Sequence, residues 1–123
     1  MAAVAYYAHP SSHAHETGYG HPESAARIAA VDAAMVEVAE IAAADVSTAT
    51  DVELRRVHSP GYVRRVLALD GEHGQLDYET VISPSSVTAA RYAAGACVGA
   101  ARGVLHGGAP SAFCAMRPPG HHA

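Results

Sequence analysis

The sequence has no lysine, no tryptophan and only one phenylalanine among its 123 residues. Its eight basic residues are all arginines, charged residues make up 16% of the chain, and the formal net charge is −4. A chain with so few basic residues does not bind nucleic acid through a general positive field, so we expect no nucleic-acid partner. Since half of the residues are apolar, the composition also excludes an intrinsically disordered chain.

Long apolar runs are absent, and cysteines are few. No run approaches the roughly 18 consecutive apolar residues of a membrane-spanning helix, so we expect no membrane partner. The apolar start of the chain lacks the basic residues of a secretion signal. Cys97 and Cys114 do not make a disulfide framework, and we expect both to be small buried side chains in a reduced, cytoplasmic protein.

Apolar strands alternate with helices along the chain. The segments 2–7 and 111–116 predict two buried strands, and a weaker pattern at 45–47 predicts a short strand between them. Apolar residues recur three and four apart over 22–42, which predicts an amphipathic helix, and an alanine-rich helix is expected over 84–105. This order predicts an α/β fold in which helices flank a parallel sheet.

Shorter elements are expected between the two long helices. Thr50 and Glu53 have the spacing of a capping box at the start of a helix. A helical pattern resumes over 62–69, and the residues that follow predict a turn at 71–74 and a loop at 77–83.

Three glycines recur every fourth residue in the alanine-rich helix: Gly95, Gly99 and Gly103. A phosphate-cradling loop is one interpretation of such spacing. A smooth helix face that lets a neighbouring segment pack closely is the interpretation we favour, because the three residues share one side of the helix.

Histidines are frequent and gather in two loops that follow predicted strands. His9, His13, His15 and His21 follow the first strand, and a second group ends the chain. In parallel α/β sheets, chemistry takes place just beyond the carboxyl ends of the strands, so both loops are candidate sites. The first four histidines are compatible with a metal site, although their spacing fixes no geometry.

The second group is the pair His121 and His122, which follows Pro118, Pro119 and Gly120. The prolines impose an extended approach, and the glycine lets the backbone crowd a site. Adjacent histidines in an extended chain point to opposite sides, so they do not share one ion without rearrangement. They serve better as two separate imidazoles beside a reacting centre. An exposed tail is the alternative.

The segment from Arg117 to Ala123, preceded by an apolar strand, resembles the signature of the histone deacetylase superfamily, which includes acetylpolyamine amidohydrolases and acetoin-utilisation proteins. Gly20-His21-Pro22-Glu23 resembles the N-terminal stretch of that family, and the segments 54–63 and 77–80 are similar to later ones. The resemblance implies that residues 1–123 form a single, partial domain with the N-terminal part of the arginase–deacetylase fold.

The resemblance also implies a zinc-dependent amidohydrolase that acts on an acetylated small molecule, such as an acetylpolyamine, or on an acetyl-lysine peptide. His122 is then the general base and acid, while His121 stays protonated and orients the attacking water. His21 and Asp77 border the substrate tunnel, and for the loop that holds the first four histidines the resemblance favours a tunnel rim over a metal site. Arg117, Pro118, Pro119 and Gly120 have structural roles beside the site, and we expect Arg117 to tie the strand end to a carboxylate or a carbonyl.

In the resembling family, the zinc ligands follow the double histidine, so no metal ligand is assigned in this sequence. We therefore interpret the chain as the N-terminal portion of a zinc-dependent deacetylase that is not catalytic by itself and holds no zinc alone. The alternative is a stand-alone, non-catalytic binding or assembly module. Because the strand at 111–116 would leave an unpaired edge, we also expect a homo-oligomer.

Overall fold

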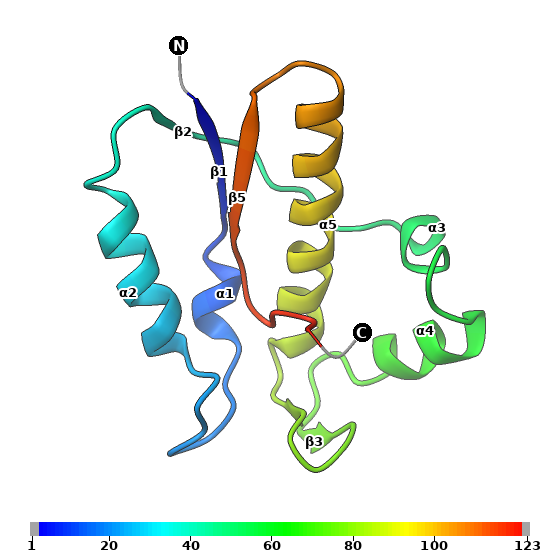
Figure 1. Ribbon diagram of the computed structural model, residues 1–123. Coiled ribbons are helices and arrows are strands. Elements are labelled where there is room, and N and C mark those ends of the chain that lie inside the picture. The colour runs from blue at the N-terminus through cyan, green and yellow to red at the C-terminus, as the bar shows by residue number, and fades with distance from the viewer. Residues whose placement is uncertain (1–2, 122–123) are drawn as a thin grey trace.

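The computed structural model describes residues 3–121, which form a parallel sheet with helices on both sides (Figure 1). Three strands make this sheet: β1 (Val4–Ala8), β2 (Ile41–Ala43) and β5 (Ser111–Ala115). Their order is β2-β1-β5, and β1 pairs in parallel with both neighbours. The predicted α/β fold with a parallel sheet is confirmed.

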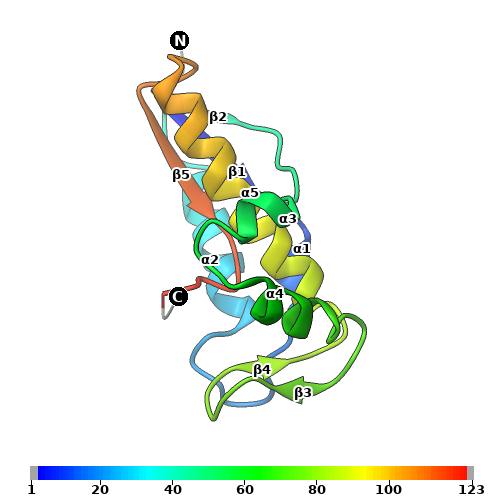
Figure 2. The same ribbon diagram turned by 90° about the vertical axis from the view of Figure 1, so that its right-hand side faces the viewer.

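The longer helices enclose the sheet. α2 (Ala25–Met35) lies on one side and α5 (Ser86–Leu105) on the other (Figure 1). Four short elements complete the fold: α1 (Ser11–Ala14), α3 (Asp51–Leu54), α4 (Pro60–Leu67) and a hairpin of β3 (Gly74–Gln75) with β4 (Val81–Ile82). Figure 2 shows the hairpin near the end of the molecule where α5 begins. None of the helices within residues 3–121 has both the length and the apolarity to span a bilayer.

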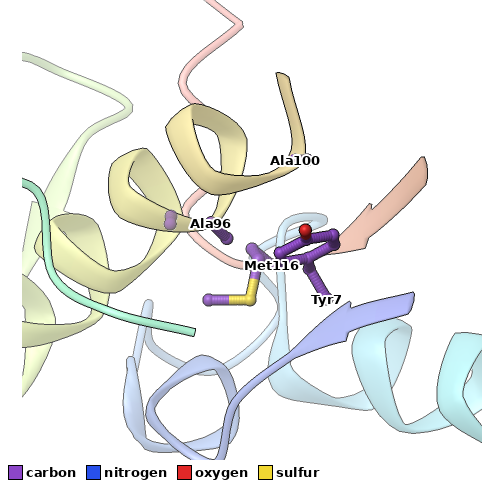
Figure 3. Packing of buried hydrophobic residues seen from close by; sticks show 5 residues of the cluster. Tyr7, Ala96, Ala100 and Met116 are labelled. Atoms are coloured by element: carbon purple, nitrogen blue, oxygen red, sulfur yellow. The ribbon is translucent and has the colours of Figure 1, made fainter. Parts of the chain in front are cut away.

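The core between the sheet and α5 is built mainly from small side chains. Ala93, Ala96 and Ala100 recur on one face of α5 and pack with Tyr7 of β1 and Met116 beyond β5 (Figure 3). This spacing of three and four residues places the alanines along a single helical stripe. Because alanine contributes little apolar area, close backbone approach has to supply much of the packing.

The glycines of α5 provide that close approach. A Cβ atom added at Gly95 would lie 1.8 Å from the carbonyl oxygen of Ser47, in the segment that connects β2 to α3. At Gly103 the nearest atom would be the Tyr7 hydroxyl at 3.1 Å, and at Gly99 it would be a ring carbon of the same tyrosine at 3.5 Å. The smooth-face interpretation is confirmed, and Gly95 is its tightest point.

Local signals at the shorter helices behave as expected. The Thr50 side chain accepts a hydrogen bond from the backbone N–H of Glu53, and the Glu53 side chain accepts one from the N–H of Thr50. The predicted capping box is therefore confirmed. The α4 helix begins with Pro60 after Ser59, whose hydroxyl caps the N–H of Tyr62.

The prediction for residues 22–47 is partly wrong. The helix ends at Met35, and the second strand is Ile41–Ala43 rather than 45–47. The chain has to reverse direction between these elements so that Ile41 can pair with Val4 of β1. Val38, which belonged to the apolar pattern, is 43% exposed in this reversal. Alanine is compatible with helix, turn and strand alike. Because alanines recur through this segment, the apolar pattern does not show where the helix ends.

Three smaller expectations also differ from the structure. The loop after β1 contains α1, and the loop at 77–83 contains β4. Cys97 is exposed and Cys114 is half-buried, so the expectation of two buried cysteines is wrong. Burial, followed by the neighbouring Cys97, raises the pKa of the Cys114 thiol to about 11.

Candidate functional site

The segments that follow β1 and β5 meet at one edge of the sheet. Because the two strands are parallel and paired over their whole length, their carboxyl ends lie side by side. α1 and the loop 15–24 follow β1, and residues 116–121 follow β5 (Figure 1). The structure therefore brings the two histidine-containing segments to the same edge.

A group of buried polar side chains underlies this edge, and we call it the anchor cluster. Its members are Ser12, His15, Glu23, Ser86 and Arg117. All of them except Glu23 are buried. They come from α1, from the loop after it, from the start of α5 and from the end of β5, so the cluster joins four segments of the chain.

Arg117 is the centre of the anchor cluster and is only 2% exposed. Its guanidinium donates two hydrogen bonds to the Glu23 carboxylate, from Nε to Oε1 at 2.6 Å and from Nη2 to Oε2 at 2.9 Å. Nη1 donates to the carbonyl oxygens of Ser12 (2.7 Å) and His15 (2.8 Å), and Nη2 also reaches the Glu23 carbonyl at 3.4 Å. The expectation that Arg117 ties the strand end to a carboxylate or a carbonyl is confirmed.

The Glu23 carboxylate is held in its charged form by cations on two sides. Arg117 binds both oxygens, and Arg27 lies 3.9 Å from Oε1. Burial of the carboxyl favours its neutral form, but the hydrogen bonds and charge of Arg117 outweigh it and hold the pKa of Glu23 below its usual value. The bidentate geometry is the strongest form of an arginine–carboxylate contact.

His15 lies between the ion pair and the start of α5. Its Nδ1 is 2.7 Å from the Ser86 hydroxyl, and its Nε2 is 3.7 Å from Oε2 of Glu23. The Ser86 hydroxyl also accepts a hydrogen bond from the backbone N–H of Ser83. The Ser83 hydroxyl in turn accepts one from the backbone N–H of Glu16. Burial, followed by the nearby charge of Arg117, lowers the pKa of His15. A neutral His15 therefore supports the ion pair without adding a third charge.

Between the anchor cluster and His121 the chain becomes exposed. Pro118 is half-buried, whereas Pro119, Gly120 and His121 are exposed. Gly120 has a φ of 67°, a conformation that glycine adopts without strain. His122 lies outside the described residues.

The two residues assigned to the tunnel rim belong to loops that contact each other. The Nε2 atom of His21 lies 3.0 Å from the carbonyl oxygen of Glu79. Its Nδ1 atom accepts a hydrogen bond from the backbone N–H of Glu23. Asp77 accepts the N–H groups of Glu79 and Thr80 at 2.9 and 2.8 Å, which shapes the tip of the hairpin. His21 and Asp77 thus meet at the backbone of Glu79.

The other histidines of the first loop have separate partners. His9 stacks on Tyr92 with ring centroids 3.7 Å apart, while His13 pairs with Asp32 at 3.0 Å. The same aspartate accepts a hydrogen bond from the Tyr6 hydroxyl. Together with His15 and His21, these side chains point to four different neighbours, so the interpretation of a four-histidine metal site is wrong. Within residues 3–121 no group of three or more histidine, cysteine, aspartate or glutamate side chains is placed to hold a metal ion.

Sequence reasoning missed the roles of Glu23 and His15. Glu23 is separated from Arg117 by 94 positions, so no local pattern could pair them. The available signal was chemical, because an arginine next to a buried strand requires a carboxylate partner. Ser12 gave no signal, because a serine in a polar loop is most often exposed.

Comparison with known proteins extends the resemblance. A family model described as "Histone deacetylase domain" matches residues 21–123. A histone deacetylase-like amidohydrolase of Pseudomonas aeruginosa is 43% identical over 75 residues, which is 60% of this chain and 20% of that protein. A probable deacetylase of Archaeoglobus fulgidus is 32% identical over 114 residues, which is 89% of this chain and 32% of that protein.

A solved structure agrees with the sequence comparisons. The crystal structure of the HDA15 HD domain matches with a TM-score of 0.88 at 27% sequence identity. The match covers 100% of this chain and 38% of that one. The chain therefore spans about a third or less of the length of the two curated relatives described above.

Proposed function

The chain belongs to the histone deacetylase family, and we propose that it supplies the double-histidine part of a deacetylase active centre for an acetylated amine. The observation that carries this proposal is the anchor of the motif. The Arg117–Glu23 ion pair joins the two segments that resemble family motifs, at the carboxyl edge of a parallel sheet.

The proposal gives the two histidines different tasks. His122 takes a proton from the attacking water and later returns it to the leaving amine, as a general base and then a general acid. His121 contributes a positive charge that orients the water. The substrate class is an acetylated lysine in a peptide or an acetylated polyamine, and the loops of His21 and Asp77 form part of its entry.

Zinc is the metal that the family implies, and the described residues do not fit it. They contain no suitable group of ligands. The proposal therefore assigns zinc to ligands elsewhere in a complete active centre and derives no step through it from this chain. It follows that the 123-residue chain alone is not expected to hydrolyse acetyl-lysine or acetylpolyamine substrates.

A second candidate function is a non-catalytic assembly module. β5 pairs with β1 along one edge, and within the described residues its other edge has no strand partner. Phe113, which stacks on Tyr6 with ring centroids 6.0 Å apart, is 42% exposed. An open strand edge beside exposed aromatic surface favours association, and a homo-oligomer is the simplest form. Light scattering that shows a monomer over a wide concentration range would contradict this candidate.

The catalytic proposal is tested on the polypeptide that the reading frame encodes, alongside the 123-residue chain. We expect turnover of an acetyl-lysine peptide or an acetylpolyamine only where sequence follows Ala123. His122→Ala is expected to reduce this turnover by about 10²–10⁴-fold. His106→Ala, at the exposed residue that directly follows α5, is the matched control and should leave the rate unchanged. Chelator-sensitive turnover by the 123-residue chain, or full activity of His122→Ala, would contradict the proposal.

A further inference from the structure

The anchor cluster fixes Arg117 more tightly than an ion pair alone requires. The guanidinium has five N–H donors, and each of them has an acceptor: two oxygens of the Glu23 carboxylate and the carbonyls of Ser12, His15 and Glu23. A lysine would keep the charge but not this planar fork. The arrangement therefore specifies an orientation as well as a charge.

The backbone of Arg117 is held by the same neighbour as its side chain. Its N–H donates to the Ser12 hydroxyl at 3.0 Å, while its Nη1 donates to the Ser12 carbonyl. Both contacts reach α1, the helix that directly follows β1. The direction in which the chain leaves β5 is thus fixed relative to β1, only four residues before His121.

The Glu23 carboxylate is committed to Arg117. Each carboxylate oxygen accepts a hydrogen bond from Arg117, and Arg117 lowers the pKa of the group against the effect of burial. Glu23 also donates its backbone N–H to His21, the residue that contacts the hairpin. It therefore links the motif of Arg117 to the loop at the proposed entry.

We propose that Glu23 and Arg117 are positioning residues for the double histidine. The carboxylate fixes the guanidinium, and Arg117 in turn sets the course of the chain toward His121 and His122. This inference rests on the proposed function. A misplacement of about 1 Å can cost about 10²-fold in rate, so the pair would act on the chemical step rather than on substrate binding.

A purely structural role predicts a different result. If the ion pair only stabilised the fold, its loss would reduce the fraction of folded protein but not the turnover of each folded molecule. The two roles are separated by measuring kcat and KM per folded enzyme, well below the melting temperature of each variant.

The kinetic experiment uses Glu23→Gln and Arg117→Lys in the polypeptide that the reading frame encodes. The matched controls are Glu53→Gln and Arg102→Lys, because Arg102 pairs with Glu53 at 3.1 Å away from the anchor cluster. We expect kcat to fall about 10²-fold in the first two variants, with KM unchanged, and both controls to match the wild type. If Arg117→Lys does not fold, Ser12→Ala replaces it, because it removes the acceptor for the Arg117 N–H and a weak hydrogen bond to the Met116 sulfur but leaves the guanidinium contacts in place. A wild-type kcat per folded molecule would overturn the proposal.

A second measurement does not depend on activity. In the 123-residue chain, Arg117→Lys is expected to shift the imidazole NMR signals of His121 and to speed amide exchange at Gly120 and His121. Arg102→Lys is expected to change neither. Unchanged signals in a folded variant would overturn the positioning role. If these signals move but the encoded polypeptide has no deacetylase activity, positioning holds and the proposed function fails.

Discussion

The two sides of this small fold are stabilised by opposite means. Between the sheet and α5, alanine and glycine let the backbones approach closely. At Gly95 the packing requires a residue without a side chain, because a Cβ atom would collide with the backbone of Ser47. At the carboxyl edge, the anchor cluster relies on one arginine with all of its donors satisfied. At Gly95 the first region has no room for an added atom, whereas the second region depends on keeping every partner of Arg117. The difference shows that the site edge is specified by directional contacts rather than by packing.

The largest expected effect is the loss of the arginine. Arg117→Ala leaves the charge of Glu23 buried beside His15 without its main partner, and breaking a buried pair in this way costs about 3–5 kcal/mol. Arg102→Ala, at an ion pair whose arginine is mostly exposed, should cost less than about 1 kcal/mol. Urea unfolding of the 123-residue chain measures both. If both variants lose the same free energy of unfolding, the anchor cluster stabilises the fold no more than the surface ion pair does.

The glycine face gives the next largest effect. The added methyl group of Gly95→Ala has to displace the backbone at Ser47. We expect this substitution to lower the free energy of unfolding by about 1–3 kcal/mol. Gly99→Ala meets only an ordinary contact with Tyr7, and the higher helix propensity of alanine should leave stability equal or increased by up to about 1 kcal/mol. Thermal unfolding of the two variants compares them directly. A Gly99→Ala variant as unstable as Gly95→Ala would contradict the close-packing account.

The two regions differ in how much of their structure could be predicted from the sequence. β1, β5 and α5 follow from apolar runs and from glycine and alanine spacing, which are local signals. The end of α2 was missed because alanine favours no single period. The contacts of Glu23 with Arg117 and of His21 with Glu79 join residues 94 and 58 positions apart, and no spacing rule connects such partners. The motif around Arg117 was predicted, but the residues that hold it were not.

The smallest of these effects is a dependence of stability on pH. Burial and then Arg117 lower the pKa of His15 below its ordinary value of 6.5, against the opposing charges of Glu23 and Glu16, with His21 adding to the lowering. As the pH falls below 6.5, the unfolded chain takes up a proton that the folded chain does not. The free energy of unfolding should then decrease by up to about 1.4 kcal/mol per pH unit.

The control for this prediction is His15→Gln, which removes the titrating group. In that variant the loss of stability just below pH 6.5 should be reduced, while the loss caused by Glu23 should persist below its ordinary pKa of 4.5, since that pKa is also lowered. Denaturant unfolding between pH 4 and 8 distinguishes the two contributions. A pH dependence that is unchanged in His15→Gln would show that another group is responsible.

The central claim is that the anchored segment presents two histidines with different catalytic tasks. The most direct measurement compares His122→Ala with His121→Ala in the encoded polypeptide, by pH–rate profile and by bound zinc. We predict that His122→Ala loses about 10²–10⁴-fold in rate together with the lower limb of the profile, that His121→Ala retains more activity, and that zinc content stays constant in both. Loss of zinc in proportion to activity in His122→Ala would make that histidine a ligand and contradict the account, as would wild-type rates in both variants.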